Sequence, residues 1–141
     1  MKQKVLVIVR GMQDYEDADA DSIELTTTGT LYEKGASYYL LYEEADESGL
    51  GKTKTTVKFE PDRVSVIRSG ESTSHLLFEE GKKHISYYDM GFGSLCVGVC
   101  THSLKKEIGP GGGFAEIRYS MEINNALAGE NHLSITVRPT F

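Results

Sequence analysis

Residues 114–124 read Phe-Ala-Glu-Ile-Arg-Tyr-Ser-Met-Glu-Ile-Asn, and apolar side chains occupy every second position from Ala115 onward. Successive side chains of a β-strand point to opposite faces, so this alternation predicts a strand with one face on a core and the other in solvent. Residues 132–138 and 52–60 show the same alternation. Together these segments predict an antiparallel sheet and an all-β protein.

Turn signals divide the rest of the chain into further short segments rich in Val, Ile, Thr and Tyr. Gly35, Pro61-Asp62 and the three glycines at 111–113 mark turns, because Gly tolerates unusual backbone angles and Pro presets φ. The nearest approach to a helical pattern, residues 103–108, is too short to be more than a turn. The predicted strands are residues 4–12, 22–32, 37–44, 52–60, 63–69, 74–79, 84–90, 94–103, 114–124 and 132–138.

Short connections favour pairing between strands that follow one another in the sequence. A meander of eight to ten antiparallel strands would expose two edges if it stayed open, and closure into a barrel removes them. The length of 141 residues fits one domain. We therefore predict a single antiparallel β-barrel over residues 1–141, with its first and last strands near each other.

The composition argues against several classes of partner. Fifteen Lys and Arg stand against 21 Asp and Glu, a net charge of -6, whereas nucleic acids and anionic membranes need a basic surface. The longest apolar run, residues 5–9, is too short to cross a membrane and does not resemble a signal peptide. We expect a cytoplasmic protein with no nucleic-acid or membrane partner.

The two cysteines are expected to be free thiols. Cys96 and Cys100 lie four residues apart on one predicted strand, which separates them by about 13 Å. A disulfide needs Cα atoms closer than about 7 Å.

Six short motifs carry a family resemblance through their order and spacing. They are Thr27-Thr28-Gly29 with Tyr32, Tyr42-Glu43-Glu44, Gly51-Lys52-Thr53-Lys54-Thr55 with Lys58, Val66-Ile67-Arg68-Ser69-Gly70, Phe92-Gly93-Ser94-Leu95 and Tyr119-Ser120-Met121. Over nearly its whole length the chain resembles the YwiB-like family of small bacterial proteins of unknown function. The resemblance implies a calycin-like, lipocalin-related β-barrel, and it implies no catalytic residue.

No motif for catalysis, metal binding or nucleotide binding is complete. Gly51-Lys52-Thr53 resembles the end of a phosphate-binding loop, but Asp46 stands where that loop needs Gly, and a strand follows instead of a helix. The spaced aspartates of residues 17–21 begin like a calcium loop, but Ser22 and Thr28 replace the required Gly and Glu. We predict no catalytic residue, no metal and no cofactor.

The candidate ligand-binding residues are Arg68, Lys54, Tyr42 and Tyr32. The cations would attract an anion, and tyrosines at a barrel mouth would offer ring faces and hydroxyls. Pairing across Pro61-Asp62 places Arg68 opposite Thr55 and Lys54 opposite Ser69. On the inner face, Arg68 would point to the interior or mouth, be less exposed than a typical arginine, and need an anionic partner.

Other interpretations of these residues stay open. A carboxylate of Glu43 or Glu44 could pair with Arg68. The lysines could protect an outer face from edge pairing, and the tyrosines could be half-buried packing residues.

These observations predict a binding module that holds a small ligand, with an anion as one option, at the mouth of the barrel. The alternative is a solidly packed barrel that acts as a protein-interaction or homodimeric structural protein. An enzyme has the least support. A cavity larger than about 300 Å³ inside the barrel, lined by Tyr and Arg, would favour the first interpretation, and a filled interior would favour the second.

Overall fold

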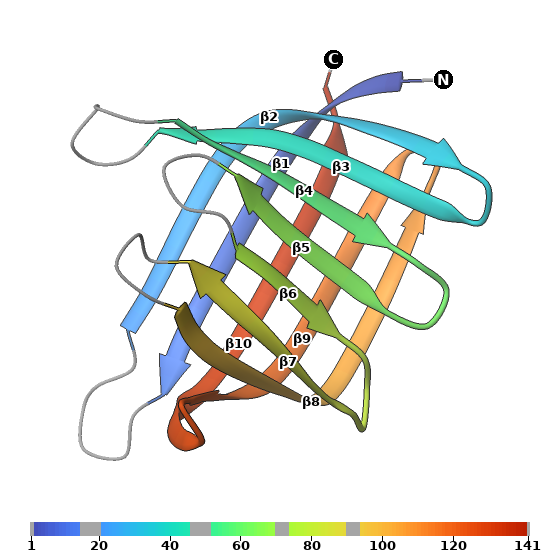
Figure 1. Ribbon diagram of the computed structural model, residues 1–141. Coiled ribbons are helices and arrows are strands. Elements are labelled where there is room, and N and C mark those ends of the chain that lie inside the picture. Colours follow the sequence, from blue (N-terminus) through green and yellow to red (C-terminus); the bar gives the residue numbers. More distant parts are fainter. Residues whose placement is uncertain (1, 15–20, 46–51, 70–73, 90–93, 141) are drawn as a thin grey trace.

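The computed structural model describes residues 2–14, 21–45, 52–69, 74–89 and 94–140, and this part of the chain consists of strands and turns (Figure 1). The strands are β1 (Lys2–Asp14), β2 (Asp21–Lys34), β3 (Ser37–Ala45), β4 (Lys52–Phe59), β5 (Val64–Ser69), β6 (Ser74–Phe78), β7 (Lys83–Asp89), β8 (Ser94–Gly109), β9 (Gly112–Ile123) and β10 (Ala126–Pro139). The all-β prediction is confirmed. Among the described residues there is no helix of the length and apolarity that a membrane span requires.

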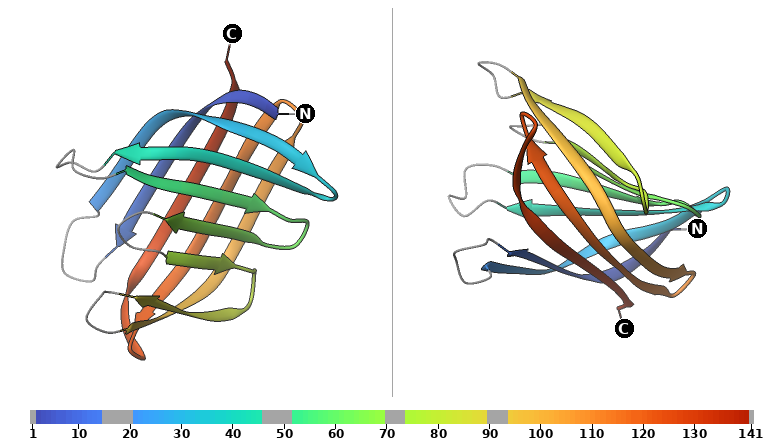
Figure 2. Two further views of the ribbon diagram at one scale, coloured as in Figure 1. Left: turned by 45° about the horizontal axis from the view of Figure 1, so that its top comes forward. Right: turned by 90° about the horizontal axis from the view of Figure 1, so that it is seen from below.

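The strands form one antiparallel sheet whose order is β6-β5-β4-β3-β2-β1-β10-β9-β8-β7. The first and last strands, β1 and β10, are therefore hydrogen-bonded neighbours, as predicted. In Figure 2 the strands β3 to β6 lie across β1, β10 and β9 at a steep angle. The two ends of the sheet, β6 and β7, contact each other, so the sheet is nearly closed into a barrel.

At a bulge in β8, the backbone of Thr101 hydrogen-bonds to the turn that joins β6 to β7. The register between β8 and β9 shifts between Thr101 and Ser103, and such a shift bends a strand and interrupts its ladder. The carbonyl of Thr101 accepts a 2.9 Å hydrogen bond from the Gly81 N–H, and the Thr101 N–H donates a 3.1 Å bond to the carbonyl of Lys82. These two bonds continue the β7–β8 pairing past Lys83, and in the described residues the sheet has no ladder between β6 and β7.

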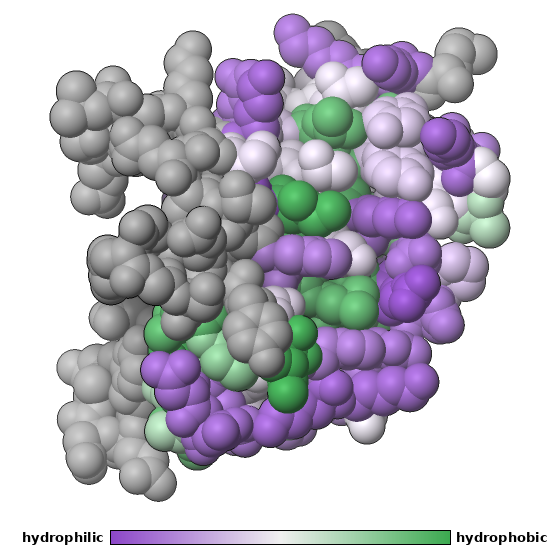
Figure 3. All heavy atoms as spheres, in the orientation of Figure 1, coloured by the Kyte–Doolittle hydropathy of each residue, from purple (hydrophilic) through white to green (hydrophobic). Residues whose placement is uncertain are grey.

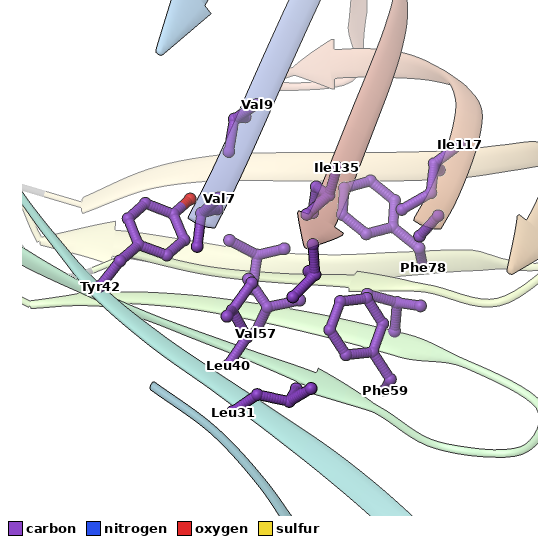
Figure 4. Packing of buried hydrophobic residues seen from close by; sticks show 14 of the residues in the cluster. Val7, Val9, Leu31, Leu40, Tyr42, Val57, Phe59, Phe78, Ile117 and Ile135 are labelled. Atoms are coloured by element: carbon purple, nitrogen blue, oxygen red, sulfur yellow. The ribbon is translucent and has the colours of Figure 1, made fainter. Parts of the chain in front are cut away.

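Apolar side chains fill the centre of the barrel, and Figure 4 shows them pointing inward from opposite walls. The Phe78 and Tyr119 rings contact each other with centroids 4.8 Å apart. The buried apolar residues are Val5, Val7, Val9, Leu31, Leu40, Tyr42, Val57, Phe59, Val64, Val66, Phe78, Val97, Val99, Ala115, Ile117, Ile135 and Val137. Their alternation along each strand is the one that the sequence shows.

Several strands are longer than predicted, β8 and β10 by the most. The turn expected at residues 103–108 is wrong, because β8 continues to Gly109 with Leu104 and Ile108 packed on the core. β10 begins at Ala126, because Asn124 and Asn125 adopt φ of 51° and 69°. Two successive positive φ angles make a tight hairpin turn, which allows pairing to start at once.

Two local predictions are confirmed. The β4–β5 hairpin has the predicted register, with Lys54 opposite Ser69 and Thr55 opposite Arg68. Cys96 and Cys100 lie on β8 and are free.

Candidate binding cleft in the barrel wall

The wall of the barrel opens where β2 and β3 diverge. β2 pairs with β1 from Asp21 to Tyr32, but it pairs with β3 only from Gly29 to Lys34. The first half of β2 stays with β1, while the second half of β3 continues beside β4, and Figure 1 shows the two strands separating. The divergence begins at Gly29, so this residue positions the opening.

Gly29 permits an unusually close contact between the two strands. A Cβ atom at this position would lie 2.6 Å from the carbonyl oxygen of Leu41 and 3.1 Å from Cγ2 of Val7. Glycine inside a strand often marks a place where another backbone approaches closely. The backbones of β2 and β3 can therefore approach closely at Gly29, the last paired residue before the two strands separate.

The space between the diverging strands is a cleft of about 790 Å³, which we call the wall cleft. Hydroxyl side chains predominate in its lining, and lysines provide its cations. The lining residues are Lys4, Thr27, Thr28, Gly29, Thr30, Leu41, Tyr42, Glu43, Lys54, Thr55, Thr56 and Ser69. Because residues of both the inner and the outer face contribute, the cleft passes into the wall and is not confined to one surface.

Two lysines and one carboxylate set the charge of the wall cleft. Lys4 and Lys54 outnumber Glu43, which is the cross-strand partner of Lys54. In the described part of the chain, no salt bridge joins either lysine to a carboxylate. The chain as a whole is acidic, with a net charge of -6. The wall cleft is therefore a locally basic site on an acidic protein, which favours an anion there.

Thr55 supplies a buried hydroxyl to the lining. The residue is 1% exposed, and its Oγ1 has no hydrogen-bond partner. A buried hydroxyl without a partner destabilises the fold by about 1–3 kcal/mol, so its presence calls for an explanation. Binding of a polar group beside Thr55 is one.

The structure separates the four residues that the sequence put forward as one site. Tyr42 and Lys54 both line the wall cleft. Arg68 and Tyr32 are not among its lining residues. Strand alternation does not account for this grouping, because Tyr42 and Arg68 share the inner face through Thr55, whereas Lys54 faces outward.

Arg68 points as predicted but is not buried as predicted. It lies in one cross-strand row with Thr55 and Tyr42, on the inner face. Its side chain is nevertheless exposed, so the expected partial burial of the guanidinium is wrong. Along β5 the first three residues are buried and the last three, which include Arg68, are exposed, and the strand ends one residue later at Ser69. Arg68 therefore does not require an anionic partner.

Tyr32 belongs to a row of stacked groups on the outer face. Its ring stacks on that of Tyr39, with centroids 5.0 Å apart and an interplanar angle of 4°. The ammonium of Lys2 lies 5.7 Å from the Tyr32 centroid, and that of Lys58 lies 5.5 Å from the Tyr39 centroid. The pKa of Lys58 is raised, mainly by its hydrogen bond with Tyr39 and next by the negative charge of the nearby Glu60 carboxylate. These aromatic residues pack against cations of the protein itself.

A second, smaller cavity of about 400 Å³ adjoins Tyr32. Its residues come from β1, β2, β3 and the β8–β9 turn, and they are Lys2, Gln3, Leu31, Tyr32, Glu33, Tyr38 and Pro110. Burial and a hydrogen bond with the Glu33 carboxylate raise the pKa of Tyr38. The Glu33 carboxylate therefore already has a hydrogen-bond partner within the protein, the Tyr38 hydroxyl.

Sequence reasoning missed most of the residues that line the wall cleft. Thr27, Thr28, Gly29 and Ser69 belong to the resemblance motifs, but neither they nor Lys4 were proposed as binding residues. The signal was present, since residues 26–30 read Thr-Thr-Thr-Gly-Thr. A lone glycine inside a strand pattern suggests a close backbone approach or a bulge.

Two histidines form polar side-chain pairs, and neither pair lines the wall cleft. Nε2 of His84 lies 3.0 Å from Oε1 of Glu79, and His102 hydrogen-bonds to Ser120. The His84–Glu79 pair accompanies Lys82 at the β6–β7 turn. In the ranges that the structure describes, no three His, Cys, Asp or Glu residues gather as metal ligands would.

Comparison with known proteins places the chain in a family. A model of the family described as "Domain of unknown function (DUF1934)" matches residues 7–135. The chain is 34% identical over 121 residues to a Bacillus subtilis (strain 168) protein described as "Uncharacterized beta-barrel protein YwiB", covering 86% of this chain and 84% of that protein. The fold also matches a crystal structure of the ywiB protein from Bacillus subtilis, with a TM-score of 0.87, 29% identity, and coverage of 99% and 94% of the two chains. The chain therefore belongs to the DUF1934 family, as the motif resemblance predicted.

Proposed function

We propose that this protein is a binding module that takes a small anionic, hydrogen-bonding ligand in the wall cleft. The observation that carries the proposal is the lining itself, in which Lys4 and Lys54 accompany a set of hydroxyls that includes the unpartnered Thr55. Such a ligand would place its negative charge near the lysines and its polar groups against the threonines.

The size and chemistry of the wall cleft support this ligand class. Its volume of about 790 Å³ lies within the range of small-molecule sites, about 300–1,000 Å³. Lysine contributes a compact charge, and hydroxyls both donate and accept hydrogen bonds. Because the centre of the barrel is packed with apolar side chains, the ligand lies in the wall. That position differs from the barrel mouth, where the sequence predicted the ligand.

Titration of isotope-labelled protein, followed by amide chemical shifts, tests the proposal. The probes are inorganic phosphate, malate and, as a neutral control, glycerol. We expect phosphate or malate to shift the amides of Thr27, Thr28 and Gly29, and glycerol to leave them unchanged. Lys54→Ala should weaken the anion's affinity about tenfold, the effect of losing one charged hydrogen bond.

The matched control is Lys105→Ala, which removes an exposed lysine of β8 outside the wall cleft. This variant should bind the anion as the parent protein does. Equal weakening by both lysine variants would indicate a general charge effect. Shifts that avoid the β2–β3 divergence altogether would contradict the assigned site.

The second candidate function is protein interaction or homodimer formation. The packed interior favours it, and so do Leu41 and Ile67, which are 38% and 39% exposed on the outer face. Figure 3 shows apolar side chains on this face as separate spots among polar ones, whereas apolar interaction sites usually form one contiguous patch. Sedimentation velocity tests this candidate, and a concentration-independent monomer would argue against a homodimer.

For the cellular location we propose the cytoplasm. The support is the free state of Cys96 and Cys100, since free thiols suit a reducing compartment.

A further inference from the structure

In the ranges that the structure describes, one edge of β2 that reaches the wall cleft is unpaired. Residues 21–28 of β2 pair with β1 through the register Gln13↔Asp21 to Leu6↔Thr28. On the side that faces β3, the ladder covers only Gly29 to Lys34. In the described part of the chain, no strand therefore pairs with the β3-facing edge of residues 21–28.

We propose that the wall cleft binds an extended peptide that carries a carboxylate and adds as a strand to the free edge of β2. This inference rests on the proposed function, because it names the class of the anionic ligand. The peptide backbone would pair with β2 beside Thr27 and Thr28, and the carboxylate would lie near Lys4 and Lys54.

Hydrogen-bonding chemistry favours a peptide. An unpaired strand edge presents alternating N–H and C=O groups, and another strand satisfies them in a way that few other molecules do. The end of this edge also lies within the cleft, because Thr27 and Thr28 are lining residues. A peptide can therefore reach this edge and the cleft's polar side chains together.

The charge of the site favours a carboxylate on that peptide. Lys4 on β1 and Lys54 on β4 lie on the two sides of the opening between β2 and β3. Glu43 disfavours a second negative charge close to β3. One carboxylate, such as a free C-terminus, matches this balance, since charged hydrogen bonds are about twice as strong as neutral ones.

The test uses the pentapeptide acetyl-Thr-Val-Thr-Val-Thr with a free C-terminal carboxylate. Its sequence is chosen for strand propensity, because the proposed recognition is by the main chain. Two N-methylated versions carry methyl groups on the odd or on the even amides. In a strand, alternate amides point to opposite edges, so one version blocks the pairing with β2 and the other does not.

We expect the parent peptide to shift the amides of Thr27 and Thr28, and its two N-methylated versions to differ in Kd by about tenfold or more. Amidation of the C-terminus should weaken binding to the parent protein. The effect of amidation should largely disappear in Lys54→Ala and persist in Lys105→Ala. Because the change is made mainly in the probe, folding of a variant does not decide the result.

Equal affinities of the two N-methylated versions would overturn the inference, and so would shifts confined to β6 or β7. If malate or phosphate binds the wall cleft and the peptide does not, the inference fails and the proposed function stands. If none of the three probes shifts the residues of the wall cleft, both fail.

Discussion

The Tyr32 and Tyr39 rings stack face to face across the β2–β3 ladder, with centroids 5.0 Å apart and planes 4° from parallel. A lysine covers each end of the pair, Lys2 at 5.7 Å and Lys58 at 5.5 Å from the ring centroids. The row ties together β1, β2, β3 and β4 on the outer face. The stacked pair lies in the half of β2 that pairs with β3, close to Gly29, where the two strands begin to separate.

Tyr39→Ala should lower the free energy of unfolding by about 2 kcal/mol, because it removes an aromatic stack and a cation–π contact. Tyr39→Phe keeps the ring and should lose less than half of that amount. Urea denaturation measures both variants. If the two variants lose equal stability, the hydroxyl and not the stack is what matters.

Gly29→Ala should destabilise the protein by about 1–3 kcal/mol, the usual effect of overpacking. The new methyl group would meet the carbonyl oxygen of Leu41 at 2.6 Å, and a backbone atom cannot swing aside. Gly11→Ala is the control, since nothing lies within 4 Å of its added Cβ. That variant should gain about 0.5–1 kcal/mol. Denaturation curves that shift equally for both would show that the contact at Gly29 relaxes freely.

Thr55→Val should raise the free energy of unfolding by about 1 kcal/mol, because it removes a buried hydroxyl that has no partner. The same substitution should weaken any anion that binds the wall cleft through that hydroxyl. Thr56→Val, on the more exposed outer face, should change stability by less than about 0.5 kcal/mol. A destabilised Thr55→Val protein would mean that the hydroxyl is satisfied within the folded chain.

Acid should weaken the fold partly through Glu60. Burial alone would raise the pKa of this carboxyl, but the hydrogen bond from Arg63 and the charges of Arg63 and Lys58 hold the pKa below its ordinary 4.5. A group with a lowered folded pKa stabilises the protein above its unfolded pKa, and this contribution is lost as the pH falls through the folded value.

Stability should therefore decline as the pH falls from about 4.5 toward lower values, and Glu60→Gln should make the decline shallower. Chemical denaturation at a series of pH values between 6 and about 2.5 provides the measurement. Parallel profiles for the parent and Glu60→Gln would contradict this assignment.

Thiol titration of the unfolded, non-reduced protein should find both Cys96 and Cys100 reactive. The two residues share a strand and a face, with Lys83 paired opposite Cys100. Their spacing along β8 prevents a bridge within the chain. Absence of reactive thiols would point to disulfides between chains.

Part of the candidate site followed from local sequence. The pairing of Thr55 with Arg68 depends on the Pro61-Asp62 turn, and the alternation of residues 52–60 places Lys54 on the opposite face from Thr55. Turn geometry and side-chain alternation act over a few residues, so they can be read from the chain. The same patterns gave no reason to group Lys4 with Lys54.

By itself the sequence determined the strands, most of their turns and the side chains that face the core, because these depend on local backbone preferences and on a period of two. Only the tertiary structure decided where the barrel opens and which residues meet there. Lys4, Thr28 and Lys54 come from β1, β2 and β4, and they share one cleft because β2 leaves β3 at Gly29. That divergence depends on how ten strands tilt and stagger to close a barrel, a constraint on the whole sheet that no single segment encodes.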